Sequence, residues 1–151
     1  MSHIRIIVAD QAEAIFYDLS SLKAHPVEVA RMSDPAAHLH DRDFSSDRPG
    51  RSYESFGKAR HAIARENDPR RREAVKFAQA IATRLDQDRR KKEYEQLIVV
   101  AAAPFRSLMR TEFTPDTAAC VVHEVPKDLV HSPVEVLCEH LPTMAQELKS
   151  A

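Results

Sequence analysis

Glycine is scarce in this chain, which has only two glycines among its 151 residues. Both Gly50 and Gly57 lie in the stretch Asp47–Gly57. Because glycine reaches positive φ angles without a steric cost, a chain so poor in glycine keeps its unusual backbone geometry for this place. The stretch continues into an arginine-rich segment that ends at Arg72. Since a polar, basic loop of this kind usually meets an anion, the sequence predicts a binding function here.

Cysteine is equally scarce, and long apolar runs are missing. Cys120 and Cys138 have neither a C-x-x-C spacing nor the pattern of a disulfide framework, so we expect two buried thiols in a reducing compartment and no disulfide. No apolar stretch approaches the length of a membrane span, and the N-terminal run is too short and too soon charged for a signal peptide. We therefore expect a cytoplasmic protein with no membrane partner.

The chain also lacks an excess of charge of either sign, because its formal net charge is -1. This balance argues against a general coat for nucleic acid, but it hides an uneven distribution. Residues 48–72 include eight Lys and Arg against three Asp and Glu, whereas residues 112–151 include two against seven. We therefore expect a basic and an acidic face on one domain, which spans residues 1–151 with a mass of 17.1 kDa.

Hydrophobic periodicity predicts an α/β fold. Three strand-like segments open the chain, and two more alternate with helical segments in its second half. The first two are close enough for an antiparallel hairpin, and the later alternation implies βαβ units with parallel strands. The expected fold is a sandwich built on a mixed sheet. Its expected strands are His3–Ala9, Ala14–Tyr17, His25–Met32, Leu97–Ala103 and Ala118–Val125.

Alternation along the third expected strand assigns its side chains to two faces. Val27 and Val29 share one side, and Glu28 and Ala30 share the other. The chain is therefore expected to open with a small sheet.

Two expected helices have clear start signals. Asp68 and Pro69 begin a long helix, because aspartate caps a helix and proline suits its first position. Ser132 and Glu135 form a capping box for a last helix, with Pro133 at its first position. The remaining expected elements are helices at Pro35–Asp41 and Pro104–Glu112 and a long loop at about residues 43–58.

Several short motifs resemble the bacterial family named for a protein required for attachment to host cells. They occur in the family's order and span nearly the whole chain. The loop motif and the tripeptide that begins at Lys127 are the most specific of them. The matching residues are Val8-Ala9-Asp10, Asp47-Arg48-Pro49-Gly50-Arg51-Ser52, Arg60-His61, Asp68-Pro69, Phe77-Ala78 and Lys127-Asp128-Leu129.

That family is similar to the middle domain of archaeal and eukaryotic peptide-release factors, a mixed α/β fold related to ribonuclease H-like domains. The resemblance implies that Asp47–Gly57 corresponds to the release-factor loop that enters the peptidyl-transferase centre before a long basic helix. In release factors, Gly-Gly-Gln in this loop positions the water that attacks peptidyl-tRNA. Here no glutamine lies between Asp47 and Arg72, and no two glycines are adjacent. The resemblance therefore favours a ribosome-facing binding protein over an enzyme, and we assign no catalytic residue.

The predicted anion- or RNA-binding site consists of the basic loop and the segment that follows it. Arginine forks suit phosphate oxygens, and backbone N–H groups near a glycine can form an anion nest. The alternative is a solvated loop in which Asp47 and Glu54 pair with neighbouring arginines. The predicted site residues are Arg48, Gly50, Arg51, Ser52, Arg60, His61 and Arg65.

Other constellations are weaker, and we expect neither a metal nor another cofactor. His38, His40 and Asp41 resemble a fragment of a zinc site, but a fourth ligand of matching spacing is missing. A nucleophilic serine at Ser52 or Ser55 lacks the strand–nucleophile–helix elbow. A magnesium site would require three carboxylates to converge, namely those of Asp10, Asp18 and Asp128.

Three functions remain open at this point. The first is a non-enzymatic domain that binds tRNA, rRNA or the ribosome through the basic loop. The second is a hydrolase that acts on peptidyl-tRNA or RNA through the same loop. The third is a protein-interaction module for an acidic partner. The sequence leaves the oligomeric state undetermined.

Overall fold

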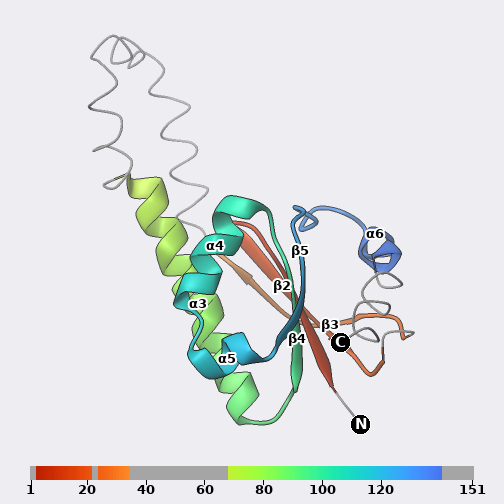
Figure 1. The fold of residues 1–151 in the computed structure, drawn as a ribbon. Helices are drawn as coiled ribbons and strands as arrows, with labels where there is room; N and C mark the ends of the chain where they lie inside the picture. The colour runs from red at the N-terminus through yellow and green to blue at the C-terminus, as the bar shows by residue number, and fades with distance from the viewer. Residues whose placement is uncertain (1–2, 22–23, 35–67, 141–151) are drawn as a thin grey trace.

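A computed structural model describes residues 3–21, 24–34 and 68–140 of the chain (Figure 1). Its centre is a five-stranded sheet with the strand order β3-β2-β1-β4-β5. β2 is antiparallel to both of its neighbours, whereas β1, β4 and β5 are parallel. The predicted mixed α/β fold is therefore confirmed. The strands are β1 (Ile4–Ala9), β2 (Glu13–Leu19), β3 (Val27–Ser33), β4 (Gln96–Val100) and β5 (Val121–Val125).

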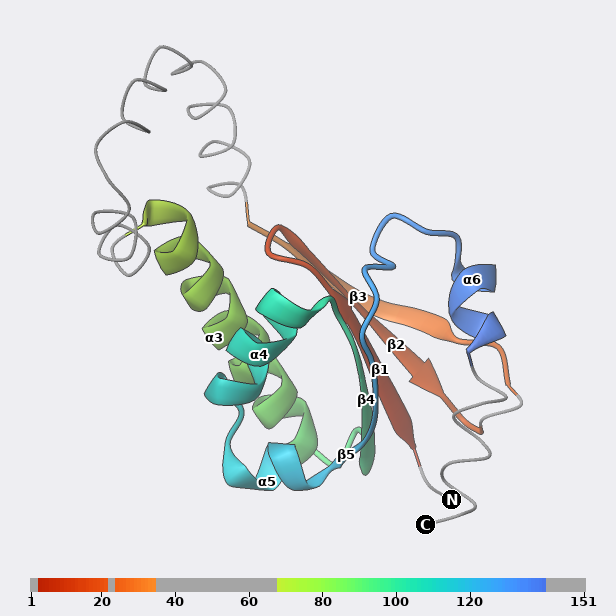
Figure 2. The ribbon, with the colours of Figure 1, turned by 45° about the horizontal axis from the view of Figure 1, so that its top comes forward.

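Helices cover both faces of this sheet, as Figures 1 and 2 show. The central strand β1 is covered on both faces, because each of its six residues is at most 4% exposed. Five of these residues are apolar, and the sixth is Arg5. In the described part of the chain, α3 (Pro69–Arg90), α4 (Ala103–Glu112) and α5 (Pro115–Ala119) lie on one face, and the short α6 (Val134–Glu139) lies on the other.

The long helix α3 follows the sequence signals closely. The side chain of Asp68 accepts a hydrogen bond from the backbone N–H of Arg70 at 2.9 Å, and Pro69 is the first helical residue. The predicted cap is therefore confirmed. One apolar stripe packs against Ile7, Phe16 and Val99 of the sheet in the larger of two hydrophobic cores. The buried apolar residues of the stripe are Ala74, Phe77, Ala78, Ile81, Ala82 and Leu85.

A buried ion pair joins α3 to the sheet. Arg5 of β1 is only 2% exposed, and its Nη1 lies 2.6 Å from Oδ2 of Asp88 near the end of α3. Its Nε donates to Oδ1 of Asp18 on β2 at 2.5 Å. Arg84 adds a second ion pair to Asp88 at 3.0 Å. A buried guanidinium needs such partners, because an unpaired buried charge is strongly unfavourable.

The third strand departs from the expected alternation. Ala30 pairs with Phe16 and Glu28 pairs with Tyr17, so a register shift between Phe16 and Tyr17 leaves Val29 as an extra residue. Adjacent strand residues point to opposite faces, and paired residues point to the same face. Glu28 and Ala30 therefore lie on opposite faces, and the prediction that they share one was wrong. The reason is a β-bulge, which an alternating pattern does not reveal.

Two boundaries in the second half of the chain also differ. The expected strand Ala118–Val125 begins only at Val121, because Thr114 caps the short helix α5 by accepting from the backbone N–H of Thr117 at 3.1 Å. The expected strand at Leu97 ends at Val100, and Ala103 already belongs to α4.

The last helix has a different start from the one expected. Its N-cap is Pro133, with no side-chain hydrogen bond, and Val134 is its first residue. The predicted capping box at Ser132 was therefore wrong, since the helix starts one residue later and Ser132 is no longer its cap. The helix expected at Pro35–Asp41 and the loop at 43–58 lie outside the described residues.

Candidate functional site

The predicted binding residues lie outside the part of the chain that the structure describes, so their placement stays a prediction. These residues are Arg48, Gly50, Arg51, Ser52, Arg60, His61 and Arg65. The structure does define the two places where their segment, residues 35–67, joins the fold. These places are the end of β3 and the start of α3. We call residues 35–67 the basic segment, because they include all of the predicted anion-binding residues.

The first junction lies beside the turn between β1 and β2. Ser33 at the end of β3 pairs with Glu13 at the start of β2. The next residue, Asp34, donates its backbone N–H to the carbonyl oxygen of Ala12 at 2.8 Å. The basic segment therefore leaves the sheet at the end where β1 finishes.

The second junction lies at the same end of the molecule, as Figure 2 shows. A hollow of about 240 Å³ separates the end of β3 from the first turns of α3. In parallel sheets, ligands bind beyond the carboxyl ends of the strands, and both junctions lie at that end. The hollow is lined by Met32, Ser33, Asp34, Glu73, Lys76, Phe77 and Ala80.

Basic side chains continue from the second junction onto α3. Arg70, Arg71 and Arg72 are all exposed, and no acidic residue stands in the first turn. Lys76 is 73% exposed and lies 3.8 Å from Glu73. The partial positive charge of a helix N-terminus disfavours cations, so helix stability does not explain these arginines. They form a basic surface directly after the predicted binding segment.

The carboxyl ends of β1 and β5 bring two motifs of the sequence together. Asp10 follows β1, and His131 belongs to the loop between β5 and α6 that also carries Lys127. The Nε2 atom of His131 lies 3.8 Å from Oδ2 of Asp10. The other carboxylate oxygen, Oδ1, accepts from the backbone N–H groups of Ala12 and Glu13 at 2.8 and 2.7 Å. Sequence reasoning missed this contact, because residues 121 positions apart carry no local signal.

The structure contradicts the magnesium hypothesis. Asp10 follows the carboxyl end of β1, whereas Asp18 pairs with Arg5 near the opposite end of the same strand. These carboxylates do not converge, because the length of the strand separates them. In residues 3–21, 24–34 and 68–140, no group of three or more His, Cys, Asp or Glu side chains is arranged to hold a metal ion. The zinc fragment His38, His40 and Asp41 lies outside these ranges.

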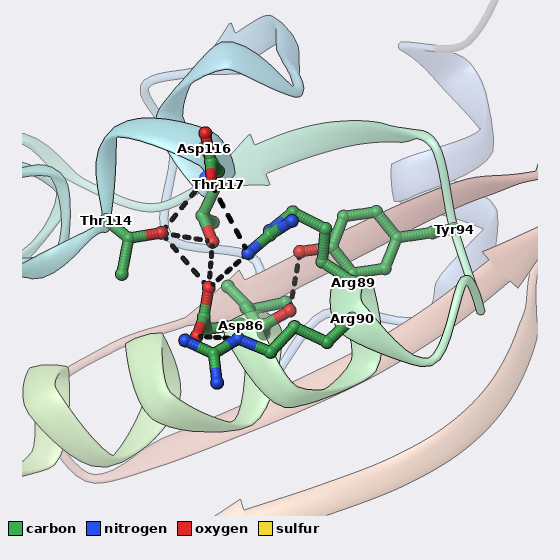
Figure 3. A network of polar contacts seen from close by, with 8 residues as sticks. Asp86, Arg89, Arg90, Tyr94, Thr114, Asp116 and Thr117 are labelled. Atoms are coloured by element: carbon green, nitrogen blue, oxygen red, sulfur yellow. Dashed lines mark hydrogen bonds and ion pairs between the residues drawn. The ribbon is translucent and has the colours of Figure 1, made fainter.

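A second polar cluster lies at the other end of α3, where Figure 3 shows it. The Oδ1 atom of Asp86 accepts from Arg89 at 2.8 Å and from Thr114 at 3.1 Å, and its Oδ2 lies 3.0 Å from Nε of Arg90. The hydrogen bond from Arg89 is the main reason why the pKa of Asp86 is lowered. Thr117 of α5 also donates to Asp86, at 3.4 Å.

This Asp86 cluster ties the end of α3 to α5. A surface hollow of about 500 Å³ adjoins it and is bordered by Gln79, Thr83, Glu112 and other residues of α3 and the chain after α4. The polar groups of Asp86 already have partners within the fold, so we interpret the cluster as structural. The signal that could have found it is the sequence Thr114-Pro115-Asp116-Thr117, which is a helix start.

The remaining sequence expectations concern thiols and membranes. Cys120 and Cys138 are both free and only partly buried. The prediction of buried thiols was therefore wrong, since Cys120 directly precedes the edge strand β5 and Cys138 lies on the outer helix α6. Burial raises the pKa of the Cys120 thiol. Among the described helices, none combines the length and apolar character that crossing a bilayer requires.

No curated protein matches the chain. Among solved structures, a chain described as "Archaeal protein" aligns with 98% of this chain at 9% sequence identity and a TM-score of 0.48. This chain covers 38% of that protein's length. A family model described as "Protein required for attachment to host cells" matches residues 5–141. The chain therefore belongs to the family of proteins required for attachment to host cells.

Proposed function

We propose that this chain is a non-enzymatic domain that binds RNA, as tRNA or in the ribosome, through its basic segment. Arg48 and Arg51 bind phosphate oxygens, helped by backbone N–H groups near Gly50 and by the Ser52 hydroxyl. Arg60, His61 and Arg65 extend the contact toward α3. The partner is anionic and extended, so binding depends steeply on salt.

The observation that carries this proposal is the exposed arginine cluster Arg70–Arg72 in the first turn of α3. It directly follows the basic segment, and helix electrostatics disfavour it there. If RNA binds at the carboxyl ends of the strands, these arginines can contact its phosphates. Arg70 also has an interaction within the protein, so we expect Arg71 and Arg72 to contribute more to RNA binding.

The experiment is a binding titration of purified protein with total tRNA and with ribosomes. The variant Arg48→Ala plus Arg51→Ala should bind more weakly, because it loses two phosphate contacts, while its thermal stability stays unchanged. A matched control, Lys91→Ala plus Lys92→Gly, removes two charges at the far end of α3, where Lys91 and Lys92 are exposed. This control should bind like the wild type.

Other outcomes point to the two other functions. Equal binding by the wild type and the loop variant at low salt contradicts the proposal. Release of peptide from peptidyl-tRNA, lost when Gly50 and Gly57 are replaced, would indicate the hydrolase. Salt-sensitive capture of a protein that survives nuclease treatment would indicate the interaction module.

A further inference from the structure

The turn between β1 and β2 is organised by one carboxylate. Oδ1 of Asp10 accepts from the backbone N–H groups of Ala12 and Glu13 at 2.8 and 2.7 Å. The backbone N–H of Asp10 donates to the carbonyl oxygen of Glu13 at 2.9 Å. Since three hydrogen bonds depend on its backbone and side chain, Asp10 sets the shape of this turn.

Two other parts of the chain contact this turn. Asp34, the last described residue before the basic segment, donates its backbone N–H to Ala12 at 2.8 Å. On the other side, Oδ2 of Asp10 faces His131 at 3.8 Å, and the Asp10 side chain is only 23% exposed. The turn thus connects the base of the basic segment with the loop between β5 and α6.

That loop has a defined backbone. Lys127 donates its N–H to Val125 at 2.9 Å, and Ser132 donates to Leu129 at 3.1 Å. Val130 is 5% exposed and belongs to the second hydrophobic core, so it anchors the middle of the loop. These contacts shape the loop itself, and the contact of His131 with Asp10 joins the loop to the turn between β1 and β2.

Lys127 itself is an exposed cation with no ion pair to any described residue. Such cations are rare in this region, because the only Lys or Arg residues of 112–151 are Lys127 and Lys149. In an otherwise acidic region, it stands at the end of the sheet where the basic segment begins. The nearest acid in sequence, Asp128, directs Oδ1 toward the backbone N–H of Val130 at 3.5 Å.

We propose that Lys127 is a further phosphate contact of the RNA-binding surface and that Asp10 is the positioning residue that holds its loop in place. This assignment rests on the proposed function. It joins two motifs from opposite ends of the chain, and it gives each a separate task. Lys127 touches the RNA, whereas Asp10 acts only through the turn and His131.

The test measures tRNA affinity across a salt series. Lys127→Ala should lower the slope of log affinity against log salt by about 0.7 to 0.9, the value for one phosphate contact. Lys127→Arg should keep the slope of the wild type. Lys91→Ala, which removes an exposed lysine at the far end of α3, should keep it too.

Asp10 is tested by non-additivity. Asp10→Ala should weaken binding, and Lys127→Ala should then have little further effect, because the loop no longer holds the lysine in place. Asp10→Asn retains an acceptor for Ala12 and Glu13 and should restore most of the affinity. Additive losses in the double variant would overturn the positioning role.

The two proposals fail in different ways. A wild type that does not bind RNA overturns the proposed function and this assignment with it. Weaker binding by the Arg48/Arg51 variant, together with an unchanged slope in Lys127→Ala, overturns only the assignment of Lys127. Thermal melting of each variant shows whether a loss arises from unfolding.

Discussion

Lys92 has the one positive φ angle found in a non-glycine residue of the described chain, at 61°. It follows the C-cap of α3, where the N–H of Glu93 donates to Asp88 and the N–H of Lys92 donates to Arg89. This is the Schellman pattern, which favours glycine at the position of Lys92. A side chain with a Cβ is disfavoured in this left-handed conformation by about 1 to 2 kcal/mol.

We therefore expect Lys92→Gly to stabilise the protein. Glycine removes the unfavourable energy of the left-handed conformation, but it also stabilises the unfolded state by about 0.4 to 1 kcal/mol through added chain entropy. The first effect is larger, so the free energy of unfolding should rise by about 0.5 to 1 kcal/mol. Urea unfolding measures it. Lys91→Gly is the matched control, because Lys91 has a φ of -80° and should gain nothing. Equal effects at both positions would contradict the explanation.

Asp88 gives a second prediction for a single residue. Burial disfavours its charged form, but hydrogen bonds from Arg5 and Arg84 outweigh this and hold the pKa of Asp88 below its ordinary value. Asp88→Ala should destabilise the protein by about 3 kcal/mol, because Arg5 stays buried with one partner fewer. Glu28→Ala, which breaks an exposed pair with Arg31, should cost no more than about 1 kcal/mol.

The sign of the pH dependence follows from the lowered pKa. Asp88 contributes stability above the unfolded pKa of about 4, and this contribution is lost as the pH falls through the folded value. As the pH falls from about 5, the wild type should therefore lose more stability than Asp88→Ala does. The difference between the two proteins should develop from about one pH unit above 4 to below 4. Parallel stability curves for the two proteins would contradict this.

At the scale of elements, Tyr94 joins α3 to the start of β4. Its hydroxyl donates to the carbonyl oxygen of Leu85 at 2.7 Å, and the side chain is 2% exposed. Burial is the main reason why the pKa of Tyr94 is strongly raised. The fold therefore holds this residue in its neutral form.

Tyr94→Phe should cost about 1 kcal/mol at neutral pH, the usual contribution of one hydrogen bond. A raised pKa means that the contribution is present below the unfolded pKa, near 10, and is lost as the pH rises beyond it. The wild type should lose stability more steeply than Tyr94→Phe above that value. Urea midpoints measured from neutral to alkaline pH check this, and a steeper loss in the variant would contradict it.

Most elements could be predicted from the sequence because their signals are local. Strands such as β1 and β4 are short apolar runs, and α3 has both a capping Asp68 and an apolar stripe. The β-bulge at Val29 and the short helix α5 were missed, because register and tertiary packing decide them. For the same reason, the contact between Asp10 and His131 was not predictable.

At the scale of the whole molecule, the two ends of α3 differ in kind. The N-terminal end of α3 lies at the carboxyl ends of the parallel strands. The basic segment joins the fold there, and Asp10 faces His131. The other end is closed by the Asp86 cluster, whose groups bond to one another (Figure 3). Because of this difference, we assign RNA binding to the N-terminal end of α3 and a structural role to its C-terminal end.

The most direct test of RNA binding is the salt slope of tRNA affinity for the wild type and for Arg48→Ala plus Arg51→Ala. We predict a steep slope for the wild type and a slope smaller by about 1.4 to 1.8 for the variant, since two phosphate contacts are lost. Absence of binding at low salt, or equal slopes for the two proteins, would contradict the proposal that this segment binds RNA.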